Sequence, residues 1–220
     1  MQITRYESGS PLAPPTLRPC TDAIGDSAVS LIGDPTLLDR KPTALFCSVQ
    51  CPGDLILKSY DLARALRAHP ITLIGGFQSP IEKEFLELLL RQPVTQPDHT
   101  PPPLPSVIIC PARGLANMRI HRPWRDPLAA GRLLLLSTFP DSLRRPTGAS
   151  ASRRNACVAA LAHRTLILHA AQGGKTEALC RQALAAAKPV HALPSPHNAH
   201  LIALGAQPIP SDDPSVLMSA

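Results

Sequence analysis

Short runs of apolar residues alternate with amphipathic segments along most of this 220-residue chain. Most positions within the runs are apolar, which is typical of strands that are buried on both faces of a parallel sheet. The segments between them repeat apolar residues at helical spacing, as Leu55, Leu62 and Leu66 do. We therefore predict an α/β fold with a mostly parallel sheet and helices on both faces. The expected strands cover residues 28–32, 43–47, 71–74, 107–110, 132–137, 165–169 and 189–193, and the expected helices 55–68, 80–91, 153–162, 176–188 and 197–204, with an edge strand at 207–209.

The pattern is absent at both ends and in one internal segment. Residues 1–25 show no periodicity, so we expect a flexible N-terminal arm with at most one short turn. Residues 26–210 are expected to form one domain, followed by a tail at 211–220. Residues 92–106 contain six prolines, which exclude a helix or a central strand. This insertion is either a surface loop or a proline-dependent docking site for a partner.

Composition narrows the classes of partner. Hydrophobic residues make up 44% and charged residues 17%, as in a globular protein, and the net charge of +6 favours anionic partners. Arginine outnumbers lysine, which suits bidentate contacts to phosphate. The four Phe, two Tyr and one Trp are too few for a broad base-stacking platform. No apolar run is long enough to span a membrane, and no signal peptide heads the chain, so we expect a cytoplasmic protein.

Cysteines and histidines give no metal or redox signature. Of the six cysteines, Cys47 and Cys51 alone are closely spaced, and zinc sites usually need a second such pair. All six are therefore expected to be buried or free thiols. No spacing of histidines or carboxylates matches a catalytic or metal-binding motif. We expect no cofactor, no metal and, on balance, no enzymatic activity.

The strongest candidate for a binding site is a glycine loop between a strand and a helix. Gly173, Gly174, Lys175 and Thr176 follow the strand at 165–169. Backbone N–H groups and the positive end of the helix dipole meet an anion at such a loop, and glycine allows its close approach. Lys175 would add a charge, and Thr176 a hydroxyl donor. A plain tight turn is the alternative, because the order of residues matches no complete phosphate-binding motif.

A second glycine loop follows the strand at 71–74. Gly75, Gly76 and Ser79 could hold phosphate, or Ser79 could simply cap the helix that Pro80 begins. Glu82, three residues after Ser79, fits a capping box, and it could instead contact a ribose or act as an acid or base. Glu177, which follows the first glycine loop, is likewise a candidate to contact a ribose or to act as an acid or base.

A basic segment, Arg153, Arg154 and Asn155, is expected to begin a helix. Cations are unfavourable at the positive end of a helix dipole, so an anion between them would explain their presence. The alternative is a solvated basic loop.

Five blocks of sequence resemble the Rossmann-like domain of the DNA-processing protein A (DprA/Smf) family, within a wider group that includes cytokinin-activating phosphoribohydrolases. The resemblance covers residues 28–209. The blocks are Leu31–Leu38 with Cys47-Ser48, Gly75–Glu82, Arg153–Asn155 with Ala159–Ala162, Gly173–Thr176, and Ala192–Pro194 with Asn198, Leu201, Ile202, Gly205 and Ala206. Val49 stands where the family has an arginine in its first loop.

The resemblance implies an accessory protein of recombination or DNA uptake that binds single-stranded DNA. Ser48 and the residues of the two glycine loops and the basic segment would line a phosphate-binding edge, and the partners would include a recombinase and a second copy of the chain in a homodimer. The alternative is a protein of the same fold that binds a small nucleotide, as a sensor or a nucleoside-phosphate hydrolase. A third alternative is a scaffold that binds only protein, through the proline-rich insertion or a dimer face.

Overall fold

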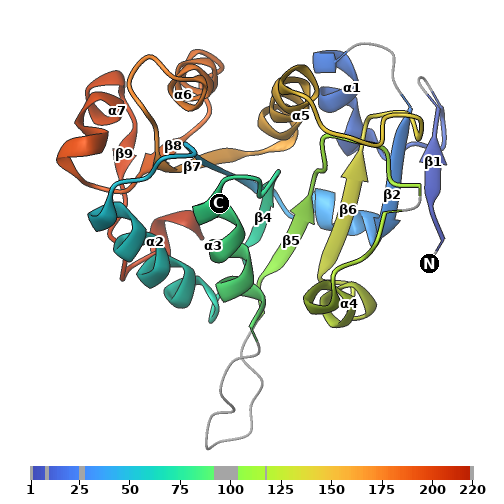
Figure 1. Ribbon diagram of the computed structural model, residues 1–220, viewed down its shortest axis with the longest axis horizontal. Helices are drawn as coiled ribbons and strands as arrows, with labels where there is room; N and C mark the ends of the chain where they lie inside the picture. The colour runs from blue at the N-terminus through green and yellow to red at the C-terminus, as the bar shows by residue number, and fades with distance from the viewer. Residues whose placement is uncertain (1, 8–9, 25–27, 92–103, 117, 219–220) are drawn as a thin grey trace, which may run out of the picture. The chain divides into compact units, whose positions relative to one another are not determined.

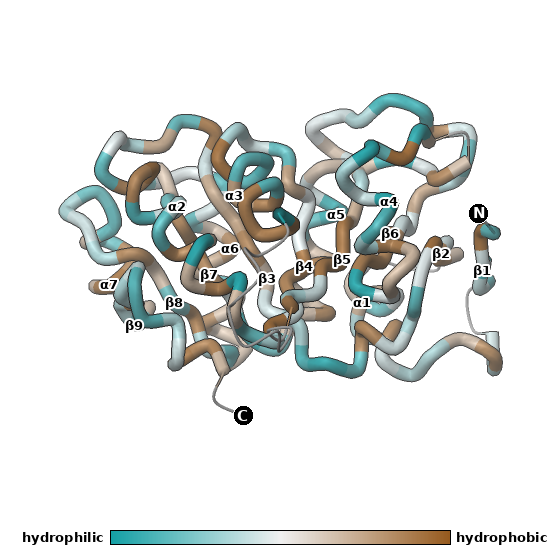
Figure 2. Tube along the Cα trace, turned by 90° about the horizontal axis from the view of Figure 1, so that it is seen from below, coloured by the Kyte–Doolittle hydropathy of each residue, from teal (hydrophilic) through white to brown (hydrophobic). Residues whose placement is uncertain are grey.

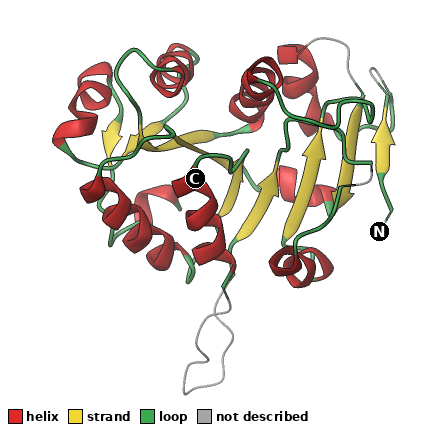
Figure 3. Ribbon diagram, in the orientation of Figure 1, coloured by secondary structure: helices red, strands yellow, loops and turns green. Residues whose placement is uncertain are grey.

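The computed structural model describes residues 2–7, 10–24, 28–91, 104–116 and 118–218. Strands and helices alternate along these residues, which contain nine strands and seven α-helices (Figure 3). Two pairings between neighbouring strands are antiparallel and five are parallel. The predicted α/β class with a mostly parallel sheet is therefore confirmed. The chain divides into two compact units, where one domain was predicted.

The first unit comprises Met1–Pro42, Thr72–Gly76 and Ser106–Ala162. Its strands lie in the order β1 (Thr4–Tyr6), β2 (Val29–Gly33), β6 (Leu133–Ser137), β5 (Ser106–Ile109) and β4 (Thr72–Gly75). The pairs β1–β2 and β2–β6 are antiparallel, and β6–β5 and β5–β4 are parallel. Within this unit, α1 (Arg18–Ile24) packs against α5 (Gly148–Leu161), and α4 (Arg122–Ala129) packs against β6 (Figure 1). Much of the tube along β5 and β6 is brown, as expected of buried strands (Figure 2).

The N-terminal segment differs from the predicted loose arm. Thr4–Tyr6 pairs with β2, and Arg18–Ile24 forms a helix. Cys20 forms a disulfide with Cys157 of α5, and both are buried. The prediction that all six cysteines are buried or free thiols was therefore wrong for this pair, which is oxidised. Main-chain pairing and a disulfide need no hydrophobic periodicity, so the sequence pattern could not indicate either of them.

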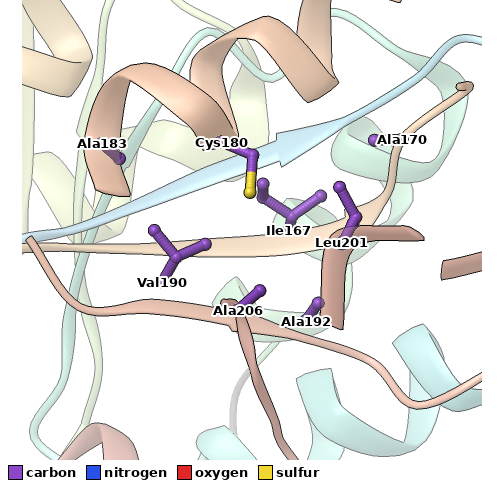
Figure 4. Packing of buried hydrophobic residues seen from close by; sticks show 8 residues of the cluster. All are labelled: Ile167, Ala170, Cys180, Ala183, Val190, Ala192, Leu201 and Ala206. Carbon is purple, nitrogen blue, oxygen red and sulfur yellow. The ribbon is translucent and has the colours of Figure 1, made fainter. Parts of the chain in front are cut away.

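The second unit comprises Thr43–Ile71, Phe77–Pro105 and His163–Ala220. Its strands are all parallel, in the order β3 (Thr43–Cys47), β7 (Arg164–His169), β8 (Val190–Ala192) and β9 (Gln207–Pro208). The helices α2 (Gly53–Leu66) and α3 (Pro80–Leu90) lie on one side of these strands, and α6 (Lys175–Ala185) and α7 (Ala199–Leu204) on the other (Figure 1). Ile167 and Val190 pack against Cys180 and Leu201 beneath α6 and α7 (Figure 4).

Most predicted elements are found close to their predicted bounds. The helix α4 was not predicted, and α5 begins five residues before Arg153 because Thr147 and Ser150 form a capping box there. Residues 92–103 of the proline-rich insertion lie outside the described residues. In the predicted tail, Leu217 is buried and Arg164 donates a hydrogen bond to the carbonyl oxygen of Val216. No helix among the described residues is long and apolar enough to cross a membrane.

Candidate functional site

Two loops of the second unit meet where the parallel strands β3 and β7 end. Cys47, the last residue of β3, is paired with His169, the last residue of β7. The chain then continues into α2 on one side of the strands and into α6 on the other. Strand ends whose following helices lie on opposite faces form a crevice, and α/β proteins bind ligands in such crevices. The residues of both loops are therefore the first candidates for a site.

The glycine loop between β7 and α6 is a tight turn. Gly173 has a φ of 71°, which favours glycine, and a Cβ added there would meet no atom within 4 Å. The Gly174 N–H donates to the carbonyl oxygen of Ala171 at 2.9 Å. A Cβ on Gly174 would lie 2.8 Å from that same oxygen. Both glycines are thus required by the turn itself, whether or not an anion binds.

Glu177, in the first turn of α6, binds the backbone of this glycine turn. Its Oε2 accepts a hydrogen bond from the Gly173 N–H at 2.8 Å, and its Oε1 accepts two from the Arg181 guanidinium at 2.7 and 3.0 Å. The Gly173 hydrogen bond, followed by the Arg181 hydrogen bond, lowers the pKa of Glu177. The Nε2 of His200 lies 3.6 Å from Oε2. The carboxylate is buried and held by these groups, so the geometry gives Glu177 a structural role and Arg181 balances its charge.

Ser48 connects the two loops. Its Oγ accepts a hydrogen bond from the Ala171 N–H at 2.9 Å and lies 3.4 Å from the Thr176 Oγ1, while its own N–H donates to the His169 carbonyl oxygen. Ser48 thereby fixes the glycine loop against the end of β3.

The start of α6 is the part of this edge that is best suited to an anion. Gly174 is its N-cap residue, and no side chain caps the helix. The first N–H groups of a helix have no acceptor within the helix and carry the positive end of its dipole. Lys175 is exposed there, and the hydroxyl of Thr176 lies beside Ser48. These groups together can bind one phosphate.

The second glycine loop leads into a different arrangement. Ser79 and Glu82 form the predicted capping box at the start of α3. Glu82 is buried, and its carboxylate also accepts hydrogen bonds from the N–H groups of Cys47 and Gln78, each at 2.8 Å. Glu82 therefore joins the start of α3 to the end of β3. Three backbone N–H groups, those of Cys47, Gln78 and Ser79, donate to this carboxylate, which gives it a structural role.

The basic segment lies in the second turn of α5, in the first unit. Arg154 is buried, and its Nη1 donates to the Cys110 carbonyl oxygen at 3.0 Å while its Nε donates to Asn155 Oδ1 at 2.7 Å. Its guanidinium lies directly against Gly76, the residue after β4. Arg153 is exposed, 6.0 Å from the centre of the Phe139 ring. The expectation that these residues begin a helix was wrong, so the argument from an unfavourable helix dipole does not apply.

The predicted site residues thus form two groups, one in each unit. Those of the second unit are Ser48, Ser79, Glu82, Gly173, Gly174, Lys175, Thr176 and Glu177, and those of the first are Gly75, Gly76, Arg153, Arg154 and Asn155. The chemical arguments from the sequence did not identify Asn198 as a residue of this site. Asn198 is fully buried. Its side chain contacts His169 Nδ1 and donates to the carbonyl oxygens of Leu168 and Leu193. This contact orients His169 beside the glycine loop, and burial lowers the pKa of that histidine.

The sequence matches no protein-family model and no curated protein. The fold, in contrast, is similar to that of DNA processing protein A (DprA) from Streptococcus pneumoniae, with a TM-score of 0.71 and 17% identity over 96% of this chain and 72% of that chain. It is also similar to DNA processing protein A from Helicobacter pylori, which binds single-stranded DNA, with a TM-score of 0.69 and 20% identity over 95% of this chain and 91% of that chain. This chain therefore has a DprA-like fold.

Proposed function

We propose that this chain binds single-stranded DNA through its phosphates and performs no chemistry on it. The observation that carries the proposal is the uncapped start of α6, where exposed Lys175 and the hydroxyls of Ser48 and Thr176 lie at the ends of two parallel strands. The fold it shares with a protein that binds single-stranded DNA supports the choice of ligand. The surplus of positive charge favours the same class of ligand.

The first unit would add electrostatic attraction. Arg144, Arg145 and Arg153 are exposed, whereas the guanidinium of Arg154 is used inside the unit. We assign Arg154 to the support of α5, and the exposed arginines to contacts with phosphates. The proposal includes an accessory role in recombination or DNA uptake in the cytoplasm, with a recombinase as partner and a homodimer as the assembly.

Binding of a labelled single-stranded oligonucleotide, measured by fluorescence anisotropy over a range of salt concentrations, tests this function. Affinity should fall steeply with salt, because each neutralised phosphate releases counterions. Lys175→Gln should weaken binding and reduce the slope of log affinity against log salt by about 0.7. The matched control is Arg91→Gln. It also removes one positive charge, but at the C-terminal end of another helix, α3, directly after Leu90.

A single nucleotide is the second candidate ligand, because one helix start with two neighbouring hydroxyls is sized for one phosphate group. Competition between nucleoside monophosphates and the labelled oligonucleotide distinguishes the two candidate ligands. If nucleoside monophosphates bind to the wild type but not to Lys175→Gln, and the oligonucleotide does not bind at all, the ligand is a nucleotide. If neither binds, or if Arg91→Gln weakens binding as much as Lys175→Gln, the site is not at the start of α6.

A further inference from the structure

Helix α4 carries positive charge next to the tryptophan of the chain. The segment that leads into this helix and its first turns contain three arginines, one histidine and the sole tryptophan of the sequence. We call these five residues the α4 patch: Arg119, His121, Arg122, Trp124 and Arg125. The arginines and the histidine are exposed, and the tryptophan is half-buried. All five belong to the first unit, and the candidate phosphate site at the start of α6 contains none of them.

The backbone brings the two rings of the patch together. His121 is the N-cap residue of α4, and its carbonyl oxygen accepts a hydrogen bond from the Trp124 N–H at 3.0 Å. The centres of the two rings lie 4.7 Å apart, and the ring planes are tilted by 53°. Arg122 and Arg125 are three positions apart, so they are neighbours on the helix surface. The start of α4 therefore carries two guanidinium groups and a partly exposed pair of rings.

The charge of the α4 patch is not balanced by acidic side chains. Arg122 and Asp126, both within the described residues, have the spacing of a helical ion pair but do not form one. The first turn of α4 contains no acidic residue, and no side chain caps the helix. Cations are unfavourable at this positive end of a helix dipole. An anion that binds here is therefore stabilised by the helix and by the arginines together.

The apolar side chains of α4 are already used in the core of the first unit. Pro127 and Leu128 are buried, and the helix packs against β6. Leu128 also lies close to Gly33, where an added Cβ would be 2.8 Å from the Leu128 Cδ1. A helix that binds a bilayer surface needs its apolar face free, so α4 is not suited to a membrane. What it leaves exposed is cationic and aromatic, the combination with which proteins bind single-stranded nucleic acids.

We propose that the α4 patch is a second binding site for single-stranded nucleic acid, in which one base stacks on Trp124 and the arginines of the patch contact the flanking phosphates. The proposal shares its class of ligand with the proposed function and rests on it to that extent. It adds a contact to a base, whereas the start of α6 offers contacts to phosphate. Every base has a π face, so stacking at the patch should add affinity with little sequence preference.

The intrinsic fluorescence of Trp124 tests the proposal directly, because the sequence has no other tryptophan. The full chain is titrated with a single-stranded deoxythymidine oligonucleotide and with an abasic strand of the same length. The oligonucleotide should quench the fluorescence, because a stacked base quenches the excited indole. The abasic strand carries the phosphates without the bases, so it should bind about fivefold or more weakly and quench little.

Three results of this titration would overturn the proposal. One is equal quenching by the two strands, and another is no quenching when the oligonucleotide saturates the chain. The third comes from vesicles of phosphatidylserine and phosphatidylcholine, which should leave the emission of Trp124 unchanged. A blue shift with these vesicles, without quenching by the oligonucleotide, would assign the α4 patch to a membrane surface instead.

Substitutions separate stacking from charge, with binding measured by fluorescence anisotropy of a labelled oligonucleotide. Trp124→Ala should weaken binding about fivefold or more, and Trp124→Phe should retain most of it, because phenylalanine keeps a stacking face. Arg122→Gln should reduce the slope of log affinity against log salt by about 0.7, and it changes an exposed residue that the fold does not need. Arg91→Gln, at the end of α3, is the matched control for charge. Equal binding by the two Trp124 variants, or equal slopes for Arg122→Gln and Arg91→Gln, would contradict the proposal.

The two proposals can fail separately. Lys175→Gln should lower the affinity but leave the quenching at saturation unchanged, since Trp124 lies in the other unit. Quenching in a chain whose affinity does not depend on Lys175 refutes the site at the start of α6 and supports the α4 patch. Binding that depends on Lys175 without any quenching supports the proposed function and refutes the α4 patch.

Discussion

The guanidinium of Arg154 occupies the space where residue 76 would carry a side chain. A Cβ built on Gly76 would lie 1.6 Å from Nη1 of Arg154, and the same Nη1 donates to the Cys110 carbonyl oxygen. The Cys110 carbonyl oxygen binds one side of the guanidinium, and the other side fits against Gly76 because glycine has no side chain. Gly76 and Arg154 therefore form one packing arrangement, although they are 78 positions apart in the sequence.

A double-mutant cycle tests this relationship. Gly76→Ala should destabilise the first unit by about 2–4 kcal/mol, because the methyl group displaces a buried, hydrogen-bonded charge. Arg154→Ala alone should also destabilise it, by leaving the Cys110 carbonyl group without this donor. The free energy of unfolding in urea should show that the double variant costs clearly less than the sum of both. Additive costs would mean that the two residues act separately.

The backbone of Gly173 provides a second prediction. Gly173→Ala should cost about 1 kcal/mol through its φ of 71°, with no steric clash because the space around the added Cβ is open. Gly173→Asn should cost less, because asparagine adopts this conformation more readily than alanine. Thermal unfolding of the two variants checks the order. Equal losses would show that the backbone conformation does not set the cost.

Stability should fall as the pH decreases below about 6.5, the ordinary pKa of histidine. Burial lowers the pKa of His191 and of His169 in the folded chain. The unfolded chain therefore binds protons first as the pH falls, and this shifts the equilibrium toward unfolding. Urea unfolding at pH 7.5 and 5.5 measures the difference. His191→Phe should reduce it, whereas His121→Gln, a change at an exposed position, should leave it unchanged.

The disulfide between Cys20 and Cys157 should contribute about 2–4 kcal/mol, because it restricts the unfolded chain across a long loop. Reduction should lower the urea midpoint of the wild type by a corresponding amount. The variant Cys20→Ser/Cys157→Ser should unfold at the lower midpoint with or without reductant. A wild type whose midpoint does not respond to reductant, after the loss of the disulfide is verified by alkylation, would contradict this.

The sequence indicated the buried strands well because their apolar runs, such as Leu133–Ser137, contain their own signal. It did not indicate where α5 begins. The capping box there pairs Thr147 with Ser150, and not with the glutamate or glutamine that makes the pattern recognisable. Thr4–Tyr6 was missed for a similar reason: its pairing with β2 depends on the backbone, and its side chains are largely exposed.

The candidate site shows where reasoning from sequence reaches its limit. The position of Gly173 and Gly174 between a strand and a helix was predicted correctly, because strand and helix signals are local. The roles of Glu82 and Arg154 were open because their partners are distant: Cys47 for the carboxylate and Cys110 for the guanidinium. Spacing along the chain cannot distinguish a polar residue that awaits a ligand from one that is already satisfied by a remote backbone group.

The disulfide also has a mechanical consequence. It joins residues that are 137 positions apart, so β2 to β6 and most of α5 lie on a closed covalent ring. A force applied to the two ends of the chain would bypass this ring and act through the sulfur–sulfur bond. The oxidised chain would therefore stretch to well under half the contour length of the reduced chain. The N-terminal segment before Cys20 and the elements that follow α5, such as α6 and β8, would bear the load first, while the ring stays closed.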